Sequence, residues 1–376
     1  MKKTLLSILA MVYAVFLVNI ANAELKLSGY QEFYMGSADQ STQLSLSSTV
    51  DEDRSYGNLS NGRFTRLIAV GTTTLDSGIT VTGTYTIAKD VDNGGDADTD
   101  GVAVDQNDII FSGNFGNLAI GNNFSTGSMM HYRGTTLVPT AEPDNNQYER
   151  YHLIDTTNFG AYDEVGYALD HMRIRYMSNV YEGFSFGADY SSCSTDTSAN
   201  ASKSDCNSAT TQYSDRFDVV AKYEMPFEGG SFGLTYGMVT ANSPFISGTT
   251  KYNDVEVTTW SAQVKYAGLT AIYRYNDAGD SLLDESNTDD GDDTGSTLAA
   301  RYDMGNFSVG YFNVETETKI TGQSLMNDQT ISGVSFGYNL GGGVNIEGAY
   351  MSHEENQANA KYTDADVVLT KLSFGF

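Results

Sequence analysis

Charged side chains in the middle of the chain have types and a spacing suited to sorting ions. Arg173 and Arg175 are two residues apart, so on a β-strand both point to one face, while the apolar residues beside them point to the other. They come directly after the stretch 123–170, whose candidate partners for the arginines are the acids Glu142, Asp144, Glu149, Asp155 and Glu164. Opposed acidic and basic groups across a narrow aqueous passage produce a field that discriminates between charged solutes.

Three further basic residues nearer the N-terminus are candidates for the same charged wall. Lys26 lies in one alternating segment of the sequence, and Arg63 and Arg66 lie in the next. Because Arg63 and Arg66 are three residues apart, a regular strand can direct only one of them to its polar face. We therefore expect Lys26 and one of these two arginines to accompany Arg173 and Arg175.

These residues belong to short segments in which apolar and polar side chains alternate. In the segment 79–87, Ile79, Val81 and Tyr85 fall on one face and four threonines on the other, which is the pattern of a strand with one apolar side. The same pattern predicts sixteen strands, at 25–35, 61–75, 79–89, 106–113, 117–122, 171–178, 184–190, 215–223, 231–239, 255–266, 269–276, 296–303, 307–315, 329–339, 344–352 and 366–376.

The connections between these segments alternate between short turns and long polar loops. Short links such as 76–78, 267–268 and 304–306 suit hairpins. Many segments also begin or end in an outward aromatic residue on the short-turn side, namely Phe184, Tyr223, Phe232, Tyr266, Tyr302, Phe307, Tyr338 and Phe376. A soluble sandwich or a β-solenoid can show alternation too, but neither predicts an even strand count with this asymmetry. The pattern favours an all-β, 16-stranded antiparallel transmembrane β-barrel with short periplasmic turns and long extracellular loops.

The stretch 123–170 is the third of the long connections and differs from all the strands. It shows no sustained alternation and contains Pro139 and Pro143. Loops of this length are uncommon in compact domains unless they have a function. We therefore expect the function of the protein to depend on this loop.

The first 23 residues have the pattern of a cleaved signal peptide. Lys2 and Lys3 precede the apolar run 5–20, and Ala21 and Ala23 form a cleavage site. A membrane anchor is the alternative, but the run is short for a transmembrane helix. Residues 24–376 contain no other apolar run of that length, so a membrane protein could only be a barrel, although the composition also suits a secreted β-protein. The formal charge of −27 argues against a nucleic-acid partner and favours cations.

Two polar loops carry further candidate sites. Cys193 and Cys206 lie in a Ser/Thr-rich stretch, and after export the pair is expected to form a disulfide. Asp96, Asp98 and Asp100 have the spacing of the first half of a calcium loop, although the bidentate Glu that would close it is missing. The sequence indicates no required cofactor, so any bound calcium would be structural. Divalent cations bound to the acidic run 284–293 would bridge it to the phosphates of lipopolysaccharide.

Three motifs resemble the general diffusion porins of Gram-negative bacteria, especially the alphaproteobacterial type. They are residues 76–80 after a Gly-Thr-Thr strand, residues 110–121, and the terminal strand 371–376. The resemblance implies that 24–376 is one porin domain in the outer membrane, in contact with its lipids and assembled as a homotrimer. It also implies that the third loop folds into a water-filled pore for ions and small hydrophilic solutes, opposite the basic wall. Within that loop, 162–167 resembles the acidic-Gly motif of such loops.

Other functions remain open at this point. The four histidines, His131, His152, His171 and His353, lie in no recognisable catalytic constellation, so we do not expect an enzyme. A substrate-specific channel is the stronger alternative, with a solute-binding patch in the third loop formed by Tyr132, Tyr148, Tyr151 and Tyr162. A purely structural or adhesive barrel would differ from both in conducting little.

Overall fold

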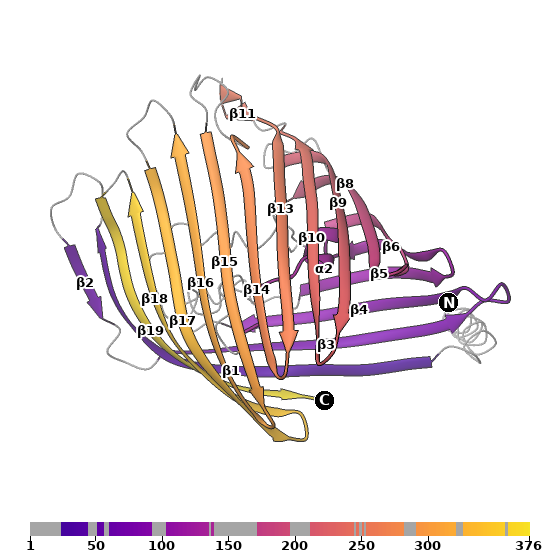
Figure 1. Ribbon diagram of the computed structural model, residues 1–376, viewed down its shortest axis with the longest axis horizontal. Coiled ribbons are helices and arrows are strands. Elements are labelled where there is room, and N and C mark those ends of the chain that lie inside the picture. Colours follow the sequence, from indigo (N-terminus) through magenta and orange to yellow (C-terminus); the bar gives the residue numbers. More distant parts are fainter. Residues whose placement is uncertain are drawn as a thin grey trace, which may run out of the picture.

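The computed structural model describes most of the chain after the N-terminal segment (Figure 1). The described residues are 24–43, 51–55, 60–91, 103–134, 137–138, 171–195, 211–243, 246–247, 250–251, 253–281, 291–320, 326–357 and 360–376. Several predicted features therefore lie outside them, namely the signal peptide 1–23, the calcium loop with Asp96, Asp98 and Asp100, Cys206 and the run 284–293. Cys193 lies in a described strand, but its predicted partner does not.

The described strands form one large antiparallel sheet and one small hairpin, of strands β11 (Ile246–Ser247) and β12 (Thr250–Lys251). The members of the large sheet are β1 (Glu24–Gln43), β2 (Asp51–Ser55), β3 (Ser60–Thr74), β4 (Thr80–Val91), β5 (Ala103–Gly113), β6 (Gly116–Asn123), β7 (His171–Met177), β8 (Phe184–Thr195), β9 (Thr211–Phe227), β10 (Gly230–Asn242), β13 (Val255–Tyr266), β14 (Leu269–Gly279), β15 (Gly291–Met304), β16 (Phe307–Ile320), β17 (Met326–Gly341), β18 (Val344–Gln357) and β19 (Ala360–Gly375). β2 pairs only with the far end of β1, opposite 39–43. The other sixteen strands form a closed barrel, because β1 pairs with β19 from Tyr30↔Gly375 to Thr42↔Thr363.

The sixteen predicted strands are confirmed, and most extend further than the sequence pattern predicted at the long-loop end. β1, for example, continues to Gln43, although its alternation was followed only to residue 35. Pairing continues there because the backbone groups of β1 find partners on β19 and β2, although the side chains no longer alternate between apolar and polar. β2, β11 and β12 were not predicted, since they are too short to show a period.

Tight turns join the strands at the other end of the barrel. Ala267 and Gly268 form the two-residue loop between β13 and β14, with φ angles of 47° and 87°. Positive φ at both central residues is the requirement of a type I′ hairpin, which suits glycine at the second position. This turn holds Tyr266 directly opposite Leu269 and so sets the register of the hairpin.

Alternation separates an apolar outer face from an inner face. On β7, Met172 and Ile174 are 51% and 52% exposed, whereas Arg173 and Arg175 between and beside them are buried inside. The predicted aromatic residues of the short-turn side lie on the outer face, and the rings of Phe184 and Tyr223 contact each other at a centroid distance of 4.4 Å. Among the described residues, no helix has the length and apolarity needed to cross a membrane.

Candidate functional site

The first part of the third loop lies on the inner face of the barrel. It begins after β6 and forms the short helix α2 (Thr126–Met130), which contacts β7, β8 and β9 (Figure 1). Ser125 is the N-cap, and its hydroxyl accepts a hydrogen bond from the Ser128 N–H at 3.1 Å. The described remainder of the loop, 131–134 and 137–138, continues along the wall towards β16.

Two buried carboxylates of the wall bind the start of this helix. Asp189 of β8 accepts the Thr126 N–H, and Asp218 of β9 accepts the Gly127 N–H at 2.9 Å. The first backbone N–H groups of a helix have no partner within the helix and carry partial positive charge. The two carboxylates therefore satisfy donors that would otherwise be buried without a partner.

Two arginines neutralise these carboxylates from the same wall. Arg173 Nη1 lies 3.0 Å from Asp189 Oδ1, and Arg216 Nη2 lies 3.7 Å from Asp218 Oδ2. All four side chains are at most 1% exposed. Removing one member of such a pair would leave an uncompensated buried charge, so the four residues act as one anchor for the loop.

Arg175 holds the chain just before the helix. Its Nη1 donates to the carbonyl of Phe124 and to Asn123 Oδ1, the latter at 3.2 Å. Asn123 in turn donates to Asp108 of β5 at 3.2 Å. The last residues of β6 and the first residues of the loop are thus fixed to the neighbouring strands on both sides.

Beyond the helix, His131 binds the wall through β10. Its Nδ1 lies 2.6 Å from Thr235 Oγ1, and Thr235 in turn bonds to Ser261 of β13. Burial lowers the pKa of His131 well below its usual value of 6.5, and the positive charges of Arg274 and Lys222 add to this effect. The imidazole is therefore neutral in the docked loop.

Tyr132 continues the contact to β9 and β13. Its N–H donates to Ser261 Oγ at 2.9 Å, its hydroxyl donates to Glu224 Oε1 at 2.7 Å, and Lys222 Nζ lies 4.5 Å from its ring centroid. Burial and the bond to Glu224 raise the pKa of Tyr132, so the phenol keeps its proton. Since Tyr132 is only 7% exposed, it is not available for the solute-binding patch expected in this loop, and its predicted companions lie outside the described residues.

Glycines on the inner face make room for the loop. A Cβ at Gly187 would lie 2.6 Å from Met130 Sδ, one at Gly237 would lie 2.6 Å from His131 Nε2, and one at Gly310 would lie 2.6 Å from Val138 Cγ1. At Gly233 the added atom would collide with the Tyr132 hydroxyl. The wall therefore has a track of missing side chains that the loop follows from β8 to β16.

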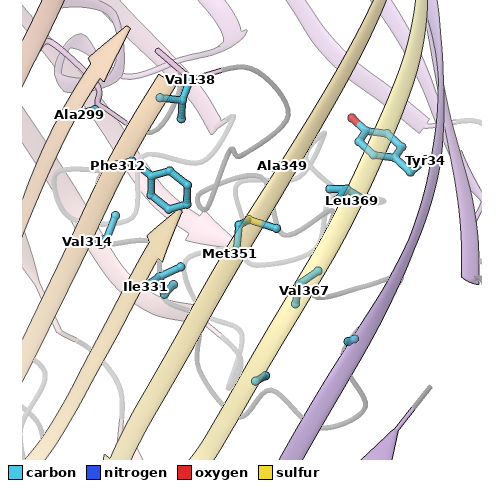
Figure 2. Close-up of a cluster of buried hydrophobic side chains, with 12 residues drawn as sticks. Tyr34, Val138, Ala299, Phe312, Val314, Ile331, Ala349, Met351, Val367 and Leu369 are labelled. Carbon is cyan, nitrogen blue, oxygen red and sulfur yellow. The ribbon is translucent and has the colours of Figure 1, made fainter. Parts of the chain in front are cut away.

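The end of this track is apolar. Val138 is buried with a cluster of inward-facing side chains, and Leu137 packs against the same cluster (Figure 2). The members on the wall are Tyr34, Ala38, Ala299, Phe312, Val314, Ile331, Ala349, Met351, Ala365, Val367 and Leu369. Each large apolar side chain buried here contributes about 1.5–3 kcal/mol. Charged side chains therefore line only part of the inner face, since β15–β19 and β1 contribute this apolar sector.

The predicted basic wall is corrected by these positions. Arg173 and Arg175 do share the inner face, but they are enclosed between the wall and the start of the loop rather than lying opposite it. Arg66 points inward with Tyr30 and Phe64, whereas Arg63 points outward, because it lies directly opposite the outward Phe33. Lys26 is exposed near the short-turn end, 3.2 Å from Glu24. The acids Glu142, Asp144, Glu149, Asp155 and Glu164 lie outside the described residues.

A second group of charges lies half of the barrel away from α2 in strand order. Lys371 of β19 lies 2.7 Å from Glu347 of β18 and 3.7 Å from Glu32 of β1. On β3, the Arg66 guanidinium lies 5.3 Å from the Phe64 ring centroid and 5.7 Å from that of Tyr30. On β15, Arg301 and Asp303 form a further pair at 2.8 Å, and Arg301 also donates to the Leu137 carbonyl of the third loop.

Sequence reasoning identified the loop but not its anchors. The candidate site residues did not include Asp189, Asp218, Arg216, Thr235 or Ser261. Their signal was available in part, since each lies at an inward position of a predicted strand. What the sequence could not show is which inward residues meet the loop, because that depends on the register of five strands.

Comparison with known proteins identifies the family. The model of the Gram-negative porin family matches residues 9–358. Among solved structures, the outer membrane channel DcaP of Acinetobacter baumannii is 11% identical with a TM-score of 0.64. The match covers 95% of this chain and 98% of the DcaP chain. The anion-selective porin from Comamonas acidovorans is 13% identical with a TM-score of 0.61, and a triple mutant of the Rhodopseudomonas blastica porin is 18% identical with a TM-score of 0.55. Each of these two matches covers 94% of this chain and 100% of the other porin's chain. No curated protein matches. The chain belongs to the Gram-negative porin family, whose members are diffusion channels of the outer membrane.

Proposed function

We propose that this porin is a water-filled channel of weak charge selectivity, in which ions and small hydrophilic solutes pass the anchored third loop and a ring of paired charges on the inner face. The observation that carries the proposal is that accessible charges of the inner face occur next to charges of opposite sign. Arg301 and Asp303 are 35% and 48% exposed at their side chains, and Lys222 and Glu224 are 22% and 49% exposed. Lys371 with Glu32 and Glu347 supplies a similar but less exposed mixture across the barrel, with side chains 9%, 16% and 19% exposed.

A paired ring of this kind supports general diffusion. A cation and an anion within one ion pair give a strong local field but little net potential along the passage, so neither sign of solute is excluded. The family is one of channels, and the chain is not an enzyme. The balance of positive and negative charges on the inner face should determine ion selectivity more than the net negative charge of the whole chain does.

The proposed assembly is the homotrimer that the family resemblance implies. The outer face of β3 and β4 supports a contact with a second copy, because Gly71 and Gly83 lie directly opposite each other and both face outward. A Cβ at Gly71 would meet nothing within 4 Å, and one at Gly83 would meet only the Asp108 carbonyl at 4.0 Å. The packing of the described residues thus gives no reason for glycine at either position, whereas a neighbouring subunit would.

The experiment that tests the proposal is reconstitution of the purified protein in a planar bilayer. We expect large conductance steps that close in groups of three. In a salt gradient, the reversal potential should be small, as for a channel with weak preference for one sign of ion. An absence of conductance steps would contradict the channel. Ideal selectivity for one sign of ion would contradict the paired ring.

A further inference from the structure

A groove on the inner face, away from the described part of the third loop, has the chemistry of a solute-binding site. It has a volume of about 650 Å³ and lies where the barrel closes, between β18, β19, β1 and β3. Its lining consists of Gly29, Gly343, Gly375, Phe376 and six further residues, namely Ser28, Tyr30, Glu32, Ile68, Asn345 and Ser373. All six lie at inward positions of their strands, alternating with the outward residues Leu27, Phe33, Leu67, Ile346, Leu372 and Phe374.

The groove is hollow because its floor lacks large side chains. Ser373 lies opposite both Glu32 and Asn345, and Gly375 lies opposite Tyr30 in the next row of the sheet. Serine and glycine leave the space that a larger inward residue would fill. A pocket of several hundred Å³ with a few placed polar groups is of the size that accommodates a small ligand.

The polar groups of the groove suit vicinal hydroxyls. Glu32 and the Asn345 side-chain carbonyl accept hydrogen bonds, the Asn345 amide group donates, and the Ser28, Tyr30 and Ser373 hydroxyls can do either. Asn345 Nδ2 already lies 3.5 Å from Ser373 Oγ, so the two strands present their polar groups at one point. The Tyr30 ring adds an apolar surface of the kind on which the C–H face of a sugar packs.

The charges around the groove are balanced, which argues for a neutral ligand. Glu32 shares the ammonium of Lys371 with Glu347, and the Arg66 guanidinium lies against the Tyr30 ring. Two carboxylates therefore lie near two cations. A solute with net charge would meet an opposing charge on either side, whereas a neutral polyhydroxylated solute would meet only donors and acceptors.

We propose that this groove is a binding subsite for a neutral sugar of one or two rings, which samples the inner wall of the channel during passage. This proposal rests on the proposed function in one respect, since solutes reach the groove only if the channel is open. It differs from a binding patch in the third loop, because none of the described residues that line the groove belongs to that loop.

The test is current recording of the full-length protein in a planar bilayer with maltose added on both sides. We expect a concentration-dependent reduction or interruption of the ion current, with half-maximal effect at millimolar maltose. Ser373→Leu fills the groove and should raise that concentration at least about tenfold, which is the loss of about 1.4 kcal/mol of binding. Asn345→Leu on the neighbouring strand is the second variant, in case Ser373→Leu does not fold.

Ser231→Leu is the matched control, since Ser231 also faces inward near the short-turn end, on β10 instead of β19. The effect of maltose on its current should equal that in the wild type. The comparison accounts for changes in current that come from the viscosity of maltose or from a bulkier side chain in the lumen. Wild-type current that ignores maltose, or an equal maltose effect in the wild type and in a folded groove variant, would overturn the subsite while leaving the channel intact. An absence of ion current in all proteins would instead contradict the proposed function.

Discussion

Arg173 Nη1 lies 3.0 Å from Asp189 Oδ1, and the side chains of both residues are completely enclosed between the barrel wall and the third loop. The same carboxylate accepts the Thr126 N–H of α2 through its other oxygen. One buried ion pair therefore joins two strands of the wall to the helix that starts the loop. The position of the loop in the channel follows from this contact and its neighbours.

Replacement of Asp189 by Ala is expected to loosen the loop. It leaves Arg173 buried without its carboxylate and the Thr126 N–H without its acceptor, at an expected cost of about 3–5 kcal/mol in loop docking. Single-channel recordings should show increased current noise and sub-conductance states. Asp303→Ala breaks the exposed pair with Arg301 and is the control, with an expected cost of at most about 1 kcal/mol. Equal noise in both variants would contradict the anchor.

The contact between Gly233 and Tyr132 can be tested by a double-mutant cycle. Gly233→Ala introduces a methyl group that collides with the Tyr132 ring and should destabilise the docked loop by about 1–3 kcal/mol. In a Tyr132→Ala background the same change should have little further effect, because the colliding ring is gone. Protease sensitivity of the folded barrel measures the docking. Additive effects of the two substitutions would show that Tyr132 does not occupy the track.

Docking of the loop should weaken as the pH falls below about 6.5. The docked His131 has its pKa lowered well below 6.5, so it stays neutral while the undocked imidazole takes up a proton. The contribution of His131 is therefore fully present above that pH and is lost below it, at up to about 1.4 kcal/mol per pH unit. Conductance noise measured from pH 7 to pH 5 should rise more steeply in the wild type than in His131→Gln. The other titratable groups are the same in both proteins, so only the difference between the two profiles reports His131, and identical profiles would rule out its contribution.

The proposed trimer contact can be tested on the outer face of β3. Gly71→Leu adds a bulky side chain where no described residue of the same chain would clash, so the barrel should fold while the oligomer dissociates. Electrophoresis of unheated samples distinguishes trimer from monomer. Ala271→Leu, on the outer face of β14, is the control and should stay trimeric if the contact is on β3 and β4. A trimer that is unaffected by Gly71→Leu would move the interface elsewhere on the barrel.

The barrel could be predicted because each strand carries its own signal. Alternation at Ile79, Val81 and Tyr85, for instance, depends only on neighbours in sequence and on one lipid-facing side. The site depends instead on contacts between residues far apart in the chain, such as Thr126 with Asp189 or Tyr132 with Glu224. Spacing showed that Arg173 and Arg175 face inward, but an inward side chain can lie under the loop or across from it. Only the path of the loop over Gly187, Gly233 and Gly237 decides between these positions.

The central claim is that solutes pass a ring of paired charges on the inner face, and the reversal potential of Arg301→Gln tests it most directly. Arg301→Gln leaves Asp303 without its cation beside the passage. One unit charge at about 4 Å in water changes the energy of an ion by about 1 kcal/mol, so the cation-to-anion permeability ratio should rise roughly two- to fivefold. Arg63→Gln removes the same charge from the outer face and should leave the ratio unchanged. An unchanged ratio in Arg301→Gln, or an equal shift in both variants, would contradict the account.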